Sequence, residues 1–171
     1  MAVGDIRNYN RISWILLASF VIELLGLVVL TSGWGSRWIL SFTGPKAAFL
    51  VQLFFWGAVG ASIASSLFLA RDKEDNEIES LKPTPDPSKL RYPTDVDVHL
   101  YVHRVLTSAA LAVVGALFLY AGLSFFDVPQ DVSNPKHLAF FILFAFLVGF
   151  YQGNFVSFLS ERFRKMLERS G

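Results

Sequence analysis

The chain has 171 residues, 53% hydrophobic and 15% aromatic, and its mean hydropathy of +0.47 predicts a protein of the lipid bilayer rather than a soluble domain. The lack of cysteine excludes disulfides, thiolate nucleophiles and cysteine-ligated zinc or iron–sulfur sites. The net charge is only +1, but the charged residues gather in residues 1–11, 71–104 and 161–169. This segregation indicates membrane partitioning, with lipids as partners, and excludes the basic stripe of a nucleic-acid-binding protein.

Four apolar runs, each near the length of about 20 residues that crosses hydrocarbon, follow one another along the chain. They cover residues 12–30, 47–70, 100–126 and 138–159. The first run is too long for a signal peptide and lacks a small-residue cleavage site, so we expect it to be retained. The sequence therefore predicts one all-α domain over residues 1–171, a four-helix integral membrane bundle.

The basic residues predict the orientation of this bundle. With a cytoplasmic amino terminus, only Arg37, Lys46 and Lys136 of the 15 Lys and Arg residues fall outside, which leaves 12 inside. The positive-inside rule therefore favours a multi-pass protein with both termini in the cytoplasm.

Two of the connections between the runs have a distinctive composition. The linker over residues 31–46 carries Trp34 and Trp38, which suit the membrane interface. The cytoplasmic loop over residues 71–99 begins with an acidic, helix-compatible half that continues the second span. Its KPTPDP segment is expected to be extended, because proline disfavours helix in the residue before it.

Polar side chains inside the runs are the candidates for a functional site. Glu23 lies near the middle of the first run, where a carboxylate is costly unless it faces the bundle interior, a water-filled cavity or a partner. It lines a pore in one interpretation and locks two helices together in the other. Gln52, Gln152 and Asn154 are the candidate partners at similar depth.

Small residues recur at helical spacing in the last three runs, which predicts close helix packing within one chain or between chains. They are Gly57, Ala61 and Ser65 in the second run, Ser108, Ala112 and Ala116 in the third, and the GxxxG pair Gly149 and Gly153 in the fourth.

The start of the third run combines a helix cap with a histidine stripe. Thr94 followed three residues later by Asp97 predicts a capping box. Asp95, His99 and His103 then fall on one stripe, which is either a metal site with an incomplete ligand set or an ordinary first turn with histidines at the headgroups. We favour the ordinary turn and expect no bound metal.

No cofactor or catalytic motif is expected. His103 and His137 lie at opposite ends of their spans, so they cannot ligate one haem. The chain contains no HExxH, GxSxG or P-loop motif, so we do not expect an enzyme.

The last run continues into a charged tail over residues 160–171, and we expect one helix from His137 to Arg169 that leaves the membrane as a cytoplasmic extension. The apolar side chains of this extension follow coiled-coil spacing, which suits self-association or contact with the inner loop. These residues are Val156, Leu159, Phe163 and Met166. Alternatively, the extension lies on anionic lipid.

Three features of the last three runs resemble a loose group of small bacterial four-span membrane proteins of no assigned function. They are the glycine-rich GAVGASIASS of the second run, Arg104 at the entry of the third, and the FLSER sequence that ends the fourth. The resemblance covers about two thirds of the chain. It implies a four-span fold and carries no function.

The leading hypothesis is a small channel or pore-forming subunit, a homo-oligomer in which Glu23 and the amide side chains line a polar path. The alternative is a non-catalytic accessory or anchoring subunit of a larger membrane complex, because polar groups in spans also serve to pair helices. A third hypothesis is a metal or proton carrier that uses Glu23 and the histidine stripe.

Overall fold

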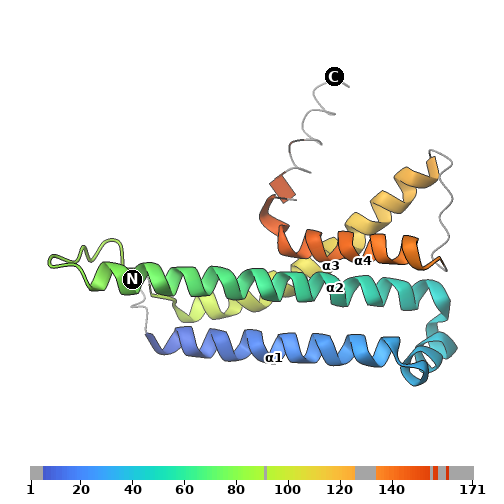
Figure 1. The fold of residues 1–171 in the computed structure, drawn as a ribbon, viewed down its shortest axis with the longest axis horizontal. Coiled ribbons are helices and arrows are strands. Elements are labelled where there is room, and N and C mark those ends of the chain that lie inside the picture. The colour runs from blue at the N-terminus through green and yellow to red at the C-terminus, as the bar shows by residue number, and fades with distance from the viewer. Residues whose placement is uncertain (1–5, 91, 126–133, 155, 158–160, 162–171) are drawn as a thin grey trace.

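The structure is a computed structural model that describes residues 6–90, 92–125, 134–154, 156–157 and 161. These residues form helices and their connections, without a β-strand in the described ranges (Figure 1). The helices are α1 (Ile6–Thr31), α2 (Gly33–Ser80), α3 (Asp95–Phe125) and α4 (Pro135–Phe150). The prediction of an all-helical chain is confirmed for the described residues.

Within the described residues, three helical segments are long and apolar enough to cross a membrane: Arg7–Thr31, Ala48–Ser80 and Asp97–Ala121. The fourth, α4, has 16 residues and is a shorter apolar helix. The second helix is central, because it packs against each of the other three, with α1 along one side and α4 along another (Figure 1).

The linker predicted over residues 31–46 is mostly helical, because α2 already begins at Gly33. The first turns of α2, drawn in light blue, do not continue the line of the rest of the helix (Figure 1). Pro45 accounts for such a bend, since proline lacks an N–H and its ring clashes with the carbonyl one turn earlier. At its other end α2 continues past Ala70 to Ser80, as the acidic half of the loop predicts.

The predicted capping box at the start of α3 is present. The Thr94 backbone N–H and hydroxyl both donate to Asp97 Oδ2, at 2.7 and 2.9 Å, and the Asp97 backbone N–H lies 3.4 Å from Thr94 Oγ1. These reciprocal bonds satisfy donors that the first turn of a helix leaves without partners.

The last helix differs from the prediction of one helix from His137 to Arg169. Asn134 caps its start, with Pro135 in the first turn, and the helix ends at Phe150 rather than Leu159. Tyr151 leaves helical geometry at φ −101° and ψ 28°, and the following residues turn away from the axis of α4 (Figure 1). Glycine costs about 1 kcal/mol of helix propensity relative to alanine, so the segment between Gly149 and Gly153 is a weak point of the helix.

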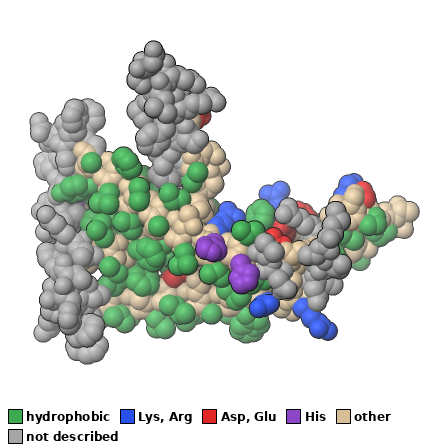
Figure 2. All heavy atoms as spheres, turned by 180° about the vertical axis from the view of Figure 1, so that it is seen from behind, with side chains coloured by type: hydrophobic (Ala, Val, Ile, Leu, Met, Phe, Trp, Pro, Cys, Tyr) green, Lys and Arg blue, Asp and Glu red, His purple; other side chains and the backbone are tan. Residues whose placement is uncertain are grey.

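The core of the described residues consists of two clusters. One joins α1, α2 and α3 through side chains such as Ile12, Leu16, Ala61, Leu69, Val105 and Ala109. The other joins α2, α3 and α4 through Leu53, Ala112, Ala116, Phe141, Ala145 and Val148. Many of the other large apolar side chains are exposed. The charged side chains gather toward one end of the molecule (Figure 2).

Candidate functional site

Glu23 lies on the face of α1 that packs against α2, and only 5% of the residue is exposed. Its Oε1 accepts two hydrogen bonds, from Ser19 Oγ at 2.6 Å and from Ser62 Oγ at 2.9 Å. Ser19 precedes Glu23 by one turn of α1, whereas Ser62 belongs to α2. The carboxyl group therefore joins the two helices through its own side chain.

The second carboxyl oxygen, Glu23 Oε2, is buried and has no hydrogen-bond partner among the described residues. The same is true of Ser65 Oγ, one turn along α2 from Ser62. A buried polar atom without a partner is uncommon in proteins and costs free energy. An oxygen in this position can hold a proton or take part in binding a cation.

The other predicted polar residues do not join Glu23. Gln52 is half-buried in α2, and Asn154 is exposed. Gln152 accepts a hydrogen bond from Ser108 Oγ, which links the segment after α4 to α3. Ser19 was within reach of sequence reasoning, because it lies four residues before Glu23, but Ser62 depends on the register between α1 and α2.

Three of the small residues predicted for helix packing, Gly57, Ala112 and Gly149, lie with Gly60 at a tight junction of α2, α3 and α4. This junction of four residues is here called the glycine seam. A Cβ atom on Gly149 would clash with the backbone carbonyl of Gly57, and one on Gly57 would clash with Ala112. Gly60, which the predicted stripe does not include, lies against the Phe146 carbonyl in the same way.

The remaining predicted packing residues divide into two groups. Ala61, Ser65, Ser108 and Ala116 are buried. Gly153, in contrast, has no atom of the described residues within 4 Å of the position of an added Cβ. Only the first glycine of the GxxxG pair therefore lies at a helix contact.

The histidine stripe offers no metal site among the described side chains. His99 and His103 are exposed, the side chain of Asp95 is outside the described part, and no group of three metal-ligating residues lies together in the described ranges. Of the tail residues, Val156 is 44% exposed, and Leu159, Phe163 and Met166 lie outside the described residues.

A second ordered region, here called the polar platform, consists of residues 71–90 and 92–94 packed on the first turn of α1. Asn8 Nδ2 donates to the Pro93 carbonyl at 2.8 Å, and Asn76 Nδ2 donates to Tyr9 Oη at 2.5 Å. The Tyr9 ring also meets Tyr92 edge-on, with centroids 6.5 Å apart. The start of α1 thus holds both the end of α2 and the approach to α3.

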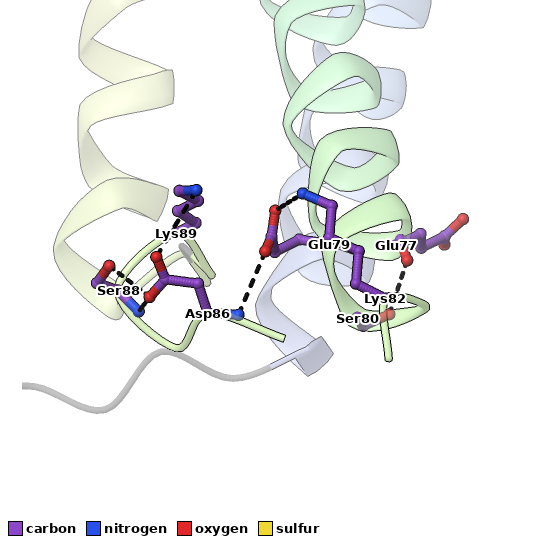
Figure 3. Close-up of polar contacts among 7 residues, drawn as sticks. All are labelled: Glu77, Glu79, Ser80, Lys82, Asp86, Ser88 and Lys89. Atoms are coloured by element: carbon purple, nitrogen blue, oxygen red, sulfur yellow. Dashed lines mark hydrogen bonds and ion pairs between the residues drawn. The ribbon is translucent and has the colours of Figure 1, made fainter. Parts of the chain in front are cut away.

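Acidic side chains fix the loop of the polar platform (Figure 3). Glu79 accepts from Lys82 Nζ at 2.6 Å and from the Asp86 backbone N–H at 3.2 Å. Asp86 in turn accepts from the Ser88 hydroxyl at 2.6 Å and the Ser88 backbone N–H at 3.0 Å. Both residues lie beyond the apolar part of α2. The bond from Lys82 lowers the pKa of Glu79, and the bonds from Ser88 lower the pKa of Asp86.

Comparison of the chain with protein-family models, with curated proteins and with solved structures finds no match. The resemblance to small bacterial four-span proteins stays a prediction.

Proposed function

We propose that the chain is an integral membrane protein whose four helices cross the bilayer with both termini in the cytoplasm. Three described segments of sufficient length and apolarity support this, as does the packing of α4 along α2 and α3. The charged end seen in Figure 2 and the polar platform then lie on the cytoplasmic side.

Within the membrane we propose a non-catalytic accessory or anchoring subunit of a larger membrane complex. The observation that carries this is the polar platform, an ordered structure outside the apolar spans that leaves Leu81 84% exposed and Ile78 54% exposed. Large apolar side chains exposed on a fixed polar surface are typical of protein contacts. The occupant we propose is a cytoplasmic segment of another subunit of that complex.

The inward position of Glu23 also favours this function over a pore. A ring of carboxylates around a symmetry axis requires the side chain to face away from its own bundle. Glu23 instead accepts bonds from Ser19 and Ser62 of the same chain, as expected for a helix-pairing group.

Purification from native membranes in a mild detergent tests the accessory function. We expect a membrane subunit to co-purify in stoichiometric amount, and Leu81→Ser to reduce its recovery several-fold, because the substitution removes an exposed apolar contact. Lys89→Ser, elsewhere on the platform, is the matched control and should retain the subunit. A chain that purifies alone from native membranes would contradict the proposal.

A channel is the second candidate because Glu23 Oε2 and Ser65 Oγ, both buried, have no hydrogen-bond partner among the described residues. Such polar atoms can serve an ion path if the chain forms a homo-oligomer. We expect a channel to conduct in planar bilayers, with altered selectivity in Glu23→Gln and unchanged selectivity in Glu74→Gln, which alters a carboxylate outside the apolar span. Silent bilayers at high protein density would exclude this function.

A further inference from the structure

A groove of about 570 Å³ runs along the surface between α1 and α2. It lies within the range of about 300–1,000 Å³ that small-molecule sites occupy. The groove is open because several of the side chains that line it are small, namely those of Ser13, Ser66 and Ala70.

The lining of this groove changes from polar to apolar along its length. Asn10, Ser13 and Lys73 line the end next to the polar platform. Leucine, isoleucine and phenylalanine side chains line the rest, namely Leu16, Leu17, Phe20, Ile63 and Leu67. The groove therefore suits an amphipathic ligand with one polar end.

Two hydroxyl groups also line the apolar part, but both already have partners. Ser62 Oγ donates to Glu23 Oε1, and Ser66 Oγ donates to the Ser62 carbonyl at 2.8 Å. Because both hydroxyl groups are already hydrogen-bonded within the chain, a ligand needs no polar group at this depth. A hydrocarbon chain can therefore lie there without leaving a donor unsatisfied.

The length of the groove matches one leaflet of a bilayer. Its α2 side extends from Ser62 to Lys73, which is about 16 Å at 1.5 Å per residue. The hydrocarbon core is about 30 Å thick, so the groove reaches from one membrane surface to near the midplane.

We propose that this groove binds a glycerophospholipid of the cytoplasmic leaflet. Its acyl chain lies between α1 and α2, and its phosphate accepts hydrogen bonds at the end formed by Asn10, Ser13 and Lys73. This inference rests on the proposed membrane insertion, but it does not depend on whether the chain is an accessory subunit or a channel.

Lys73 gives the groove a preference for anionic headgroups, because it is the one charged residue among the described residues that line the groove. Its ion pair with Glu77 is 3.7 Å long, with the Lys73 side chain 54% and the Glu77 side chain 66% exposed, so a lipid phosphate can compete for it. One lysine near a membrane surface corresponds to about a fivefold preference for an anionic over a zwitterionic lipid.

Photocrosslinking in proteoliposomes tests the site. The probes are phosphatidylglycerol and phosphatidylcholine, each with a diazirine on the acyl chain, and the adducts are mapped by mass spectrometry. We expect adducts concentrated on Phe20, Ile63 and Leu67, and about fivefold more with phosphatidylglycerol. Lys73→Glu should remove that preference, whereas Lys89→Glu, which alters a comparable exposed ion pair outside the groove, should keep it.

Filling the groove gives an independent test. Ser66→Leu should reduce groove adducts several-fold, whereas Ala110→Leu, which adds the same bulk at an exposed position of α3, should not. Adducts spread evenly over the exposed apolar side chains would overturn the proposal. Carbonate extraction separates the two failures: a chain released by carbonate contradicts membrane insertion, and a retained chain without groove adducts contradicts only the lipid site.

Discussion

The central helix α2 is packed in two different ways on its two sides. Toward α3 and α4 it presents the glycine seam, where backbone meets backbone and no Cβ can be added at Gly57 or Gly149. Toward α1 it presents side chains, and the contacts run through polar pairs such as Glu23 with Ser62 and Tyr9 with Asn76.

The two sides of α2 therefore differ in function: the side toward α3 and α4 packs closely, and the side toward α1 pairs specific residues. In the proposed membrane-embedded protein, helices have no hydrophobic drive to associate, so the close approach at the seam supplies dispersion contacts instead. The α1 side is less tightly closed, since a groove of about 570 Å³ remains along it. Its hydrogen bonds instead fix which residues of α1 lie opposite which residues of α2.

The largest effect on the free energy of unfolding is expected from Gly149→Ala in the glycine seam. The added Cβ would meet the Gly57 carbonyl, which cannot move without shifting α2, so we expect a loss of about 1–3 kcal/mol in the free energy of unfolding. Unfolding of the purified protein by SDS in mixed micelles measures this loss.

Gly153→Ala is the matched control, because it makes the same change in the same GxxxG pair at a position where no described atom lies within 4 Å of the added Cβ. Its effect should stay within about 0.5 kcal/mol. Equal effects of the two substitutions would show that the seam does not depend on backbone contact.

The next largest effect is the coupling energy between Glu23 and Ser62 on the α1 side of α2, measured in a double-mutant cycle of Glu23→Ala and Ser62→Ala. The two side chains share one hydrogen bond between helices, and such bonds contribute about 0.6 kcal/mol on average in membrane proteins. We expect a coupling energy of that order, measured by the same SDS unfolding.

A second double-mutant cycle, of Glu23→Ala with Ser66→Ala, is the control. Ser66 is also a serine of α2, but it donates to a carbonyl of its own helix, so its coupling with Glu23 should be near zero. Coupling of equal size in both cycles would mean that the Glu23–Ser62 bond does not pair the helices specifically.

The features that the sequence predicted best are those set by local chemistry. The capping box at Thr94 and Asp97 needs only residues three apart, and its bonds are present. The continuation of α2 beyond Ala70 likewise follows from the helix-compatible composition of the acidic segment.

The features that sequence reasoning missed depend on contacts between segments or on competing local terms. Ser62 meets Glu23 only in one antiparallel register of α1 and α2, which no spacing within α1 reveals. Gly149 and Gly153 look equivalent as a motif, yet α4 ends between them, so only Gly149 reaches α2. The helix over residues 33–46 formed despite Pro45, because the chain accommodates proline with a bend instead of a break.

The smallest effect is expected from a fall in pH. Acid should loosen the polar platform, which packs on α1, and leave the glycine seam unchanged, because the seam contains no ionisable group. The pKa values of Glu79 and Asp86 are lowered below their ordinary values of 4.5 and 3.8 by hydrogen bonds that favour the carboxylates. Their contribution to order is therefore present above about pH 5 and is lost as the pH falls through the lowered values. Hydrogen exchange, corrected for its intrinsic pH dependence, should show reduced protection of the Asp86 and Ser88 amides at pH 3 and unchanged protection at Gly57. Glu79→Gln should reduce the pH dependence at Asp86, and loss of protection at Gly57 in acid would contradict this difference between the platform and the seam.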